Sequence, residues 1–528
     1  MAYYKDIREY IQVLEANGKL VRITREINKD TELMPMVRWQ FRGLPAEERK
    51  TFLFEHVVDV KGKKYDGSVL VAAHAPCEEV YALAMVCDPK GIMAKWEQAQ
   101  LHPIKPKSVK SGTVQEEVHV GDKLLEHGGL DELAIPISTP GFDNAPYISA
   151  GCCVSREPDT GTYNVGTYRG MIKSPSLVGC ACSVPQDMAV HWTKYKEKGL
   201  KAMPAAIVVG AVPIIGLVSV TKFPYSVDEY DVAGGVAGEP IELVKCKTID
   251  LEVPATAEIV IEGEIPTDCL EREGPFGEYT GYTGRGWPNL FLNVTAITHR
   301  RRPIWNAFIS QFPPSESSLL TRLGFEATYF KFLRYDMGLP NLIELAFHEE
   351  SGGRQFLAMC LKNPTQPQAW KALYGAAALM PWFGKIFVVV NDDINPRDLD
   401  SVIWALVYRM QPEKDIKFIT GKQTSLDPSA GPQHEMRESL DMLPSSAVII
   451  NATRKWDYPP VSLPKKEFME RAKQIWEEEG LPPLIPKVPW HGYDLGYWTE
   501  EDEKEADLAL KGEHYQTGKK LAKGRIKL

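Results

Sequence analysis

The sequence predicts a mixed α/β protein with an N-terminal α/β domain, a central β-barrel-like domain, and a C-terminal α/β domain that ends in a peripheral helix and tail. Three observations predict this class. The chain has 528 residues, and a single core stops growing at about 250–300 residues, so several domains are expected. Helix and strand patterns alternate near both ends of the chain. The middle is rich in strand patterns and glycine turns instead.

The N-terminal domain is expected to span residues 1–115. Residues 6–16 place apolar side chains at helical spacing, and an Asn-Gly pair then ends the helix. Apolar residues at 20–23 indicate a strand directly after it. Helix and strand patterns keep alternating to about residue 115, which is typical of a small α/β domain.

The central domain is expected to span residues 116–315. Strand patterns occur at residues 206–210, 257–263 and 291–298, with glycine-rich stretches between them. The segment 203–220 carries no charge and approaches the length of a membrane span, but prolines and glycines interrupt it. We therefore expect two buried strands, or a strand and a short helix, within a β-barrel-like domain.

The C-terminal domain is expected to span residues 316–465. Residues 385–390 have the pattern of a buried strand. A helix should then begin with Asn395 as its cap and Pro396 at its first position. The apolar face of this helix is predicted to consist of Val402, Ile403, Leu406, Val407 and Met410.

The final segment, residues 466–528, is expected to form a peripheral helix and a charged tail. A helical pattern at residues 465–479 ends at a Gly-Leu-Pro-Pro sequence. Its apolar side chains are predicted to face the protein, and they are Phe468, Ala472, Ile475 and Trp476.

Composition limits the function classes. The formal net charge of −9 argues against nucleic acid or an anionic membrane as the main partner. The N-terminus lacks the apolar core of a signal peptide. Nine cysteines occur without a CxxC pair, so neither a zinc ribbon nor a thioredoxin motif is indicated. We expect reduced cysteines and a cytoplasmic location.

Two glutamates, Glu273 and Glu278, flank a Gly-Pro-Phe-Gly sequence. Such a loop can hold both acids near one site but in different environments, and paired acids of this kind supply a proton donor and a charged anchor. A surface turn with solvated glutamates is the alternative.

A second candidate segment, residues 162–169, contains Asn164 and Arg169, and uncharged residues flank the arginine. A buried arginine needs a carboxylate partner because burying its charge alone is costly. Glu273 is a candidate for that partner. An exposed arginine, or an ion pair with a purely structural role, is the alternative.

Oxygen ligands for a divalent metal occur in further segments. Asp187 follows Gln186, and Glu229 comes later in the chain. His191 lies four residues beyond Asp187, but it is not assigned as a ligand. Asn, Asp and Glu side chains suit Mg or Mn, particularly when a phosphate completes the coordination sphere. Acids are also common on protein surfaces, so this spacing alone is compatible with both interpretations.

Taken in order, these motifs resemble the UbiD family, over most of the chain from about residue 5 to 460. The matching motifs are Asn-Val-Gly-x-Tyr-Arg at 164–169, Gln-Asp at 186–187, Glu229, Glu-Leu-Val-Lys-Cys at 242–246, Val-Pro-Ala-x-Ala-Glu-Ile-Val-Ile-Glu-Gly at 253–263, Glu-Gly-Pro-Phe-Gly-Glu at 273–278 and Val-Val-Asn-Asp-Asp-Ile at 389–394. The resemblance implies a central split β-barrel, like that of flavin reductases, which binds prenylated FMN. It also implies a C-terminal domain that hinges over this barrel and mediates assembly into a homodimer or a larger homo-oligomer.

The resemblance implies roles for individual residues. Arg169 matches the arginine that meets the substrate carboxylate, Glu273 matches its acidic partner, and Glu278 matches the general acid/base. Asn164 and Glu229 match metal ligands. The residues that match positions around the cofactor are Asn164, Val165, Gly166, Arg169, Gln186, Asp187, Glu229 and Lys385.

The chain departs from the family pattern at two places. Asp187 stands where a histidine metal ligand is usual, and an aspartate adds negative charge and prefers hard ions. The expected metal set is therefore Asn164, Asp187 and Glu229, with Mn or Mg and a K⁺ ion. A Met-Pro pair beside the flavin is replaced by Phe-Pro at 223–224. The preceding Lys222 could recognise an extra anionic group on the substrate, or it could face solvent.

The implied activity is reversible, non-oxidative decarboxylation of a small aromatic or α,β-unsaturated carboxylic acid through a covalent adduct with prenylated FMN. A flavin prenyltransferase would supply the cofactor. The alternatives are a partner-dependent subunit of an aromatic carboxylase assembly and a conventional flavin oxidoreductase, although no GxGxxG follows a strand. An aromatic stripe of Phe325, Tyr329 and Phe332 is expected to be core rather than pocket lining.

Overall fold

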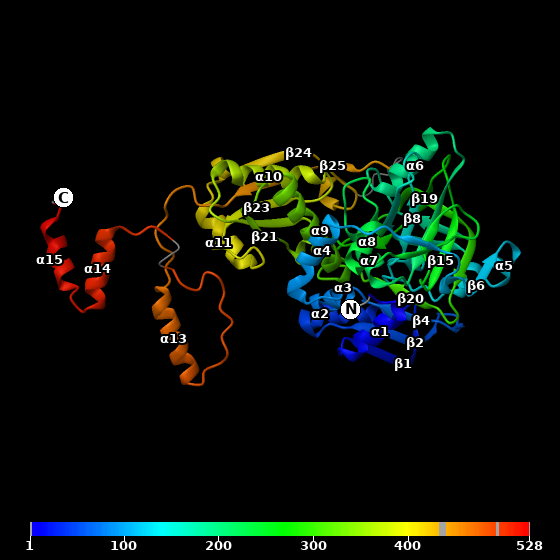
Figure 1. Ribbon diagram of the computed structural model, residues 1–528, viewed down its shortest axis with the longest axis horizontal. Helices are drawn as coiled ribbons and strands as arrows, with labels where there is room; N and C mark the ends of the chain where they lie inside the picture. Colours follow the sequence, from blue (N-terminus) through cyan, green and yellow to red (C-terminus); the bar gives the residue numbers. More distant parts are fainter. Residues whose placement is uncertain (1–2, 432–439, 493–495, 527–528) are drawn as a thin grey trace.

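The computed structural model describes residues 3–431, 440–492 and 496–526. The protein is a mixed α/β molecule with three main β-sheets (Figure 1). The N-terminal and central sheets lie close together, the C-terminal sheet lies beside them, and the last helices extend away from the body (Figure 1).

The N-terminal sheet has the order β1-β2-β4-β20, with β3 paired to β2. Its strands are β1 (Leu20–Asn28), β2 (Thr51–Val58), β3 (Lys64–Tyr65), β4 (Ser68–Val71) and β20 (Ile304–Ala307). β20 pairs in parallel with β4 although it lies more than two hundred residues further along the chain. Through β20, the end of the central segment is therefore hydrogen-bonded into the N-terminal sheet.

Short helices accompany this sheet. They are α1 (Ile7–Ala16), α2 (Leu33–Gly43), η1 (Ala46–Glu48), α3 (Glu78–Met85), η2 (Pro89–Gly91) and α4 (Ile92–Leu101). The predicted first helix is confirmed: Asp6 caps α1 by accepting a hydrogen bond from the Glu9 amide at 2.9 Å. Tyr10 and Leu14 of α1 are fully buried, as helical spacing predicts.

The central sheet is antiparallel and follows the order β7-β10-β11-β19-β15-β12-β8-β9, with β6 and β16 added to β19. Its strands are β6 (Glu117–Val120), β7 (Tyr147–Ile148), β8 (Cys152–Arg156), β9 (Tyr163–Thr167), β10 (Gly170–Ser174), β11 (Leu177–Cys180), β12 (Ala202–Val209), β15 (Ile259–Pro266), β16 (Glu271–Glu273) and β19 (Trp287–His299). The three strands predicted from patterns are confirmed as β12, β15 and β19. The uncharged segment forms β12 and a short helix, α7 (Pro213–Val220), which was one of the two expected outcomes.

Smaller elements complete the central part. A three-stranded sheet contains β5 (Lys107–Val109), β13 (Glu242–Lys245) and β14 (Glu252–Pro254), and a hairpin contains β17 (Phe276–Gly277) and β18 (Thr283–Gly284). The helices are η3 (Thr113–Gln115), α5 (Asp122–Glu126), η4 (Gly129–Glu132), α6 (Asp187–Glu197), α7 and α8 (Glu229–Ala237).

The C-terminal sheet has the order β21-β22-β23-β25-β24. Its strands are β21 (Leu342–Phe347), β22 (Phe356–Leu361), β23 (Ile386–Asn391), β24 (Ile416–Thr424) and β25 (Leu443–Asn451). The predicted buried strand is confirmed as β23, which has a parallel neighbour on each side. Val389 packs on one face of the sheet, and Val388 and Val390 pack on the other.

Helices cover both faces of this sheet. They are α9 (Glu316–Lys331), the π-helical turn η5 (Phe332–Asp336), η6 (Glu349–Ser351), α10 (Gln366–Leu379), α11 (Leu399–Arg409), α12 (Pro412–Asp415) and η7 (Pro428–Ala430). α10 shares a core with Val389, whereas α11 shares one with Val388 and Val390. The sheet is therefore buried from both sides, as its apolar central strand requires.

The prediction for α11 is wrong in two respects. The helix begins at Leu399, because Asn395 accepts a hydrogen bond from the Arg397 amide at 2.9 Å and forms a turn before it. Of the predicted apolar face, Val402 is buried, but Ile403 and Val407 are 49% and 60% exposed.

The prediction that residues 465–479 face the protein is also wrong. The helix is present as α13 (Lys466–Glu478), but none of its side chains is buried. Two further helices follow, α14 (Glu500–Leu510) and α15 (Tyr515–Lys523), and they lie apart from the body with α13 (Figure 1). In the described part of the chain, no helix has the length and apolar character needed to cross a bilayer.

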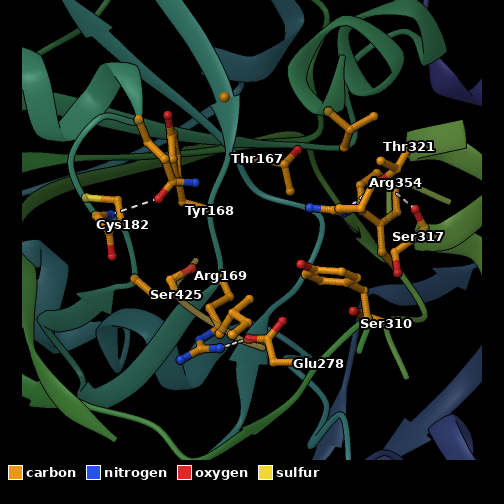
Figure 2. Close-up of a pocket in the computed structure, with 18 of the residues that line it drawn as sticks. Thr167, Tyr168, Arg169, Cys182, Glu278, Ser310, Ser317, Thr321, Arg354 and Ser425 are labelled. Atoms are coloured by element: carbon orange, nitrogen blue, oxygen red, sulfur yellow. Dashed lines mark hydrogen bonds and ion pairs between the residues drawn. The ribbon is translucent and has the colours of Figure 1, made fainter. Parts of the chain in front are cut away.

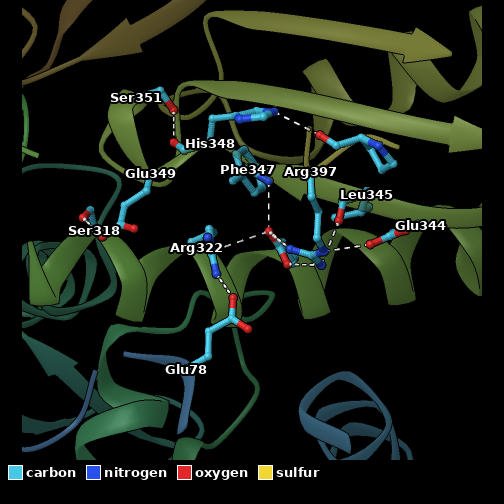
Figure 3. Close-up of polar contacts among 12 residues, drawn as sticks. Glu78, Ser318, Arg322, Glu344, Leu345, Phe347, His348, Glu349, Ser351 and Arg397 are labelled. Carbon is cyan, nitrogen blue, oxygen red and sulfur yellow. Dashed lines mark hydrogen bonds and ion pairs between the residues drawn. The ribbon is translucent and has the colours of Figure 1, made fainter. Parts of the chain in front are cut away.

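The helix α9 connects the N-terminal part to the C-terminal sheet (Figure 3). Its fully buried Glu326 accepts a hydrogen bond from the Phe347 amide at 3.0 Å and pairs with Arg397 at 2.8 Å. Arg322, one turn earlier, pairs with Glu78 of α3 (Figure 3). These contacts fix the orientation of α9, one face of which lines the cavity described next.

Candidate functional site

Arg169 lies at the centre of a buried ionic group. It sits between β9 and β10, and Glu273 binds it with two oxygens, at 2.9 Å to Nε and 2.7 Å to Nη2. Nη1 contacts Glu278. Burial opposes the charge of Arg169, but the Glu273 carboxylate outweighs this effect and raises the pKa of the guanidinium. One cation therefore faces two carboxylates, the geometry of a site that can exchange one of them for a substrate carboxylate.

The local backbone explains how both glutamates reach the same arginine. Glu273 ends β16, which pairs with β19, and it is fully buried. Gly274 follows with φ +103°, and a Cβ there would lie 2.7 Å from the Gly286 Cα. Only glycine fits this turn, which directs the chain into the β17 hairpin. Glu278 then follows β17 and returns to Arg169.

Arg169 and Glu278 line a cavity between the central and C-terminal sheets (Figure 2). The cavity contains about 1150 Å³ of space free of protein atoms, part of it open to solvent. Phe276 and Trp287 cover the guanidinium of Arg169, with ring centroids at 5.2 and 5.5 Å. Helix α9 supplies Ser317, Thr321 and Phe325 to the opposite wall.

The predicted metal ligands, Asn164, Asp187 and Glu229, form a second polar group besides the one at Arg169. The Val165 amide, next to Asn164, donates to Glu229 at 2.9 Å. Burial raises the pKa of Glu229 to about 8, and Asp187 adds to this effect. Both side-chain polar atoms of Asn164 are buried without a hydrogen-bond partner among the described residues. An amide oxygen and two carboxylates in this arrangement offer the oxygen donors that Mg or Mn prefers.

Lys222 lies beside this group and does not face solvent freely. Its Nζ lies 3.3 Å from Asp187 Oδ2, its side chain is 18% exposed, and it lines the cavity. Gln186 and Gly166 also line the cavity. Gln186 accepts a hydrogen bond from the Ser183 amide at 2.8 Å, and a Cβ on Gly166 would lie 2.5 Å from the Tyr168 ring.

The structure does not bring Lys385 to the cavity. Its Nζ binds Asp427 Oδ2 at 2.6 Å and Ser429 Oγ at 2.7 Å, so the ammonium is already paired elsewhere. His191, which was not assigned as a ligand, is buried in α6 and meets Ser155 Oγ at 3.0 Å. Burial lowers the pKa of His191 to about 4.

Two residues of the cavity wall were missed or misplaced by sequence patterns. Arg354 lines the cavity although no motif indicated it. Phe325 belongs to the core, as expected of the aromatic stripe, but it also lines the cavity. The Gly-Gly sequence before Arg354 was the available signal, because glycine pairs mark tight turns at which a side chain can be displayed.

Comparison with known proteins shows the family to which this fold belongs. Residues 107–313 match the 3-octaprenyl-4-hydroxybenzoate carboxy-lyase Rift-related domain of UbiD, and residues 318–452 match the C-terminal domain of the same family. The chain belongs to the UbiD family. This is a family of carboxy-lyases, so the enzyme class is that of a UbiD-type decarboxylase. An uncharacterised protein of Aquifex aeolicus is 30% identical over 501 residues, covering 90% of this chain and 99% of that one.

Two solved structures show how far the UbiD fold extends along the chain. An evolved dimeric form of the UbiD-class enzyme HmfF from Pelotomaculum thermopropionicum, in complex with prFMN, is 28% identical and has a TM-score of 0.74, covering 89% of this chain and all of the other. The closed form of vanillic acid decarboxylase from Sedimentibacter hydroxybenzoicus is 26% identical and has a TM-score of 0.78, covering 90% and 100%.

Proposed function

We propose that this UbiD-family protein catalyses reversible, non-oxidative decarboxylation of an aromatic or α,β-unsaturated carboxylic acid, with prenylated FMN as its cofactor. The observation that carries the proposal is the contact of Arg169 with two buried glutamates at the wall of one cavity. A structure of the similar enzyme HmfF contains prFMN, which supports the choice of cofactor.

The lining of the cavity suits such a cofactor together with an aromatic acid, because it combines aromatic side chains with a few charged and polar groups. Asn164, Asp187 and Glu229 would hold a divalent metal, Mn or Mg, with K⁺ as a companion ion. The side-chain amide of Asn164 supports this assignment, because it is buried without a partner among the residues that the structure describes, and buried polar atoms normally have one. Gln186 and Gly166 would contact the flavin.

Each residue around Arg169 has a separate role in the proposed reaction. Prenylated FMN, when bound, supplies the electron sink that an sp² carbon lacks when it loses CO₂. Arg169 holds the substrate carboxylate, and Glu273 fixes the orientation of Arg169 through two hydrogen bonds. Glu278 delivers a proton to the carbon that lost CO₂. Phe276 and Trp287 exclude water from one face of the guanidinium.

A homo-oligomer is part of the proposal. Large apolar side chains are exposed on α11 and β24 of the C-terminal part, and they are Ile403, Val407, Tyr408 and Phe418. Exposed apolar side chains of this kind are typical of a subunit interface. Helix α13 adds Phe468, Ile475 and Trp476, which no described residue of the same chain buries.

Replacement of Glu278 by Gln tests the proposal. The holoenzyme is prepared by co-expression with a flavin prenyltransferase, and release of CO₂ is measured with a panel of aromatic acids. We expect E278Q to lose at least about a hundredfold in turnover, because it lacks the proton donor. Mass spectrometry and the visible spectrum should still show bound flavin. The variant E271Q, whose glutamate pairs with Lys173 and lies in the preceding strand β16, serves as the control. Full activity of E278Q would refute the assignment.

A further inference from the structure

Arg354 is a partly buried cation with unusual surroundings. It follows η6 and points into the cavity from a different side than Arg169 and Glu278 (Figure 2). Its Nη2 donates to Thr321 Oγ1 at 2.9 Å, the one hydrogen bond that its side chain makes to the described residues. Its Nε is buried and has no hydrogen-bond partner in the part of the chain that the structure describes. The guanidinium therefore retains unused donors beside the cavity.

No carboxylate of the described chain pairs with Arg354, whereas Glu273 pairs with Arg169, and Asp393 binds Arg409 at 2.7 and 2.5 Å. The groups packed against Arg354 are aromatic, with ring centroids at 3.8 Å for Tyr279, 5.3 Å for Phe383 and 5.8 Å for Phe325. Burial lowers the pKa of Arg354 accordingly. Aromatic faces offset only part of the cost of a buried charge, so the site favours an anion from outside the chain.

The position of Arg354 is fixed by the turn before it. Gly352 has φ +70°, and a Cβ there would lie 2.5 Å from the Tyr279 ring. Gly353 has φ +69°, and its Cβ would lie 2.1 Å from the Ser318 carbonyl oxygen. The turn thus packs directly on the loop of Glu278 and on α9. A side chain held in this way presents its charge to the cavity with little loss of entropy on binding.

The chemistry of the surroundings indicates which anion binds. A cofactor phosphate would accompany the proposed metal at Asn164, Asp187 and Glu229. Lys222 stands on that side of the cavity and is already paired with Asp187. Arg354 is instead framed by rings and by the hydroxyl groups of α9, which suit the far end of an aromatic acid. The planar fork of a guanidinium matches a carboxylate.

We propose that Arg354 is a second carboxylate subsite, so that the enzyme acts on an aromatic dicarboxylic acid. One carboxylate of the substrate meets Arg169 and is lost as CO₂, and the other meets Arg354 and stays. This inference rests on the proposed function and adds the substrate class to it.

Binding to the holoenzyme tests the subsite without turnover. In the E278Q background, calorimetry compares benzoate with the three benzenedicarboxylate isomers. We expect at least one isomer to bind about tenfold more tightly than benzoate, and R354Q to remove this advantage, because truncating one partner of a buried charge pair weakens binding strongly. The Kd of benzoate should change less than about twofold in R354Q. R354K should restore part of the difference, since it keeps the charge but not the fork.

The control is R156Q, which removes a partly exposed arginine that pairs with Asp250, away from the cavity. In the active background, R354Q should raise KM for the preferred diacid and leave bound flavin unchanged in mass spectrometry. The R156Q variant should match the parent protein in both measurements.

Several results would overturn the subsite. They are equal binding of benzoate and every diacid, no binding of any diacid, an equal loss for benzoate and the diacids in R354Q, or loss of flavin from R354Q. Failure of the proposed function looks different: the parent holoenzyme then releases no CO₂ from any acid, while the comparison of diacid and benzoate binding still reports on Arg354.

Discussion

His74 is held in its neutral form by the core around it. Its side chain is 2% exposed, and its ring meets Phe308 edge-on at a centroid distance of 5.1 Å. Burial lowers the pKa of His74 to about 3. A histidine in the unfolded chain titrates near pH 6.5. The unfolded chain therefore binds more protons between these values, and the free energy of unfolding falls as the pH drops through this window.

The H74Q variant should remove this contribution. Between pH 7 and pH 5, His74 alone is expected to lower the free energy of unfolding by about 2 kcal/mol. Urea denaturation of the parent protein and of H74Q at both pH values measures the difference, and H56Q, at an exposed histidine, is the control. An identical pH dependence in the parent and in H74Q would contradict the assignment.

Single residues differ in how well the sequence predicts their environment. A lone arginine between uncharged residues predicted a carboxylate partner, and Glu273 binds Arg169 with both oxygens. No motif indicated Arg354, which is partly buried and has no such partner in the described chain. Lys385 matched a family position, but Asp427 binds it away from the cavity. Pairing depends on tertiary neighbours, which spacing along the chain does not encode.

At the level of elements, α9 depends on the pairing of Glu326 with Arg397. Glu326 also accepts the Phe347 amide of β21, so one carboxylate joins the helix to the C-terminal sheet. We expect E326Q to lower the free energy of unfolding by about 2–3 kcal/mol, because hydrogen bonds to a buried charge are lost.

Denaturation experiments can separate this effect from that of an exposed ion pair. Glu117 pairs with Arg301 at 2.9 Å, and the Arg301 side chain is 77% exposed. E117Q should therefore change the free energy of unfolding much less than E326Q does, because solvent screens an exposed ion pair. Equal effects of E326Q and E117Q would show that the buried pair does not anchor α9.

Element boundaries follow local chemistry, and this sets the limit of their prediction. Asp6 was a strong cap, and α1 begins directly after it. Asn395 and Pro396 formed an equally good cap pattern, but the chain uses Asn395 for a turn and starts α11 at Leu399. Both outcomes satisfy the same hydrogen-bonding preference of asparagine, so the pattern cannot distinguish them. The exposure of one face of α11 could not be predicted, because apolar periodicity identifies an apolar face but not what covers it.

At the scale of the whole molecule, the order of the three sheets was predictable because periodicity changes along the chain. The pairing of β20 with the N-terminal sheet was not predictable, since the sequence of a four-residue strand does not indicate which strand it pairs with.

The exposed apolar side chains of α11 and β24 are the proposed site of subunit assembly. We expect V407D to reduce the molar mass measured by light scattering, because a charge in an apolar interface is costly.

The control for that experiment is V60D. It changes a side chain that is 63% exposed and follows β2 of the N-terminal sheet. Both variants should keep the circular dichroism spectrum of the parent. An unchanged molar mass of V407D would place the subunit contact elsewhere.

The ionic group at Arg169 has one positive and two negative members. An incoming acid would bring a third negative group next to these buried charges, and two uncompensated negative charges there would be very costly. Substrate association should therefore draw about one proton from the medium. Calorimetric titration of the holoenzyme with its acid, repeated in buffers of different ionisation enthalpy, would show this uptake as a shift in the observed heat, whereas a heat independent of the buffer would mean that no proton accompanies the ligand.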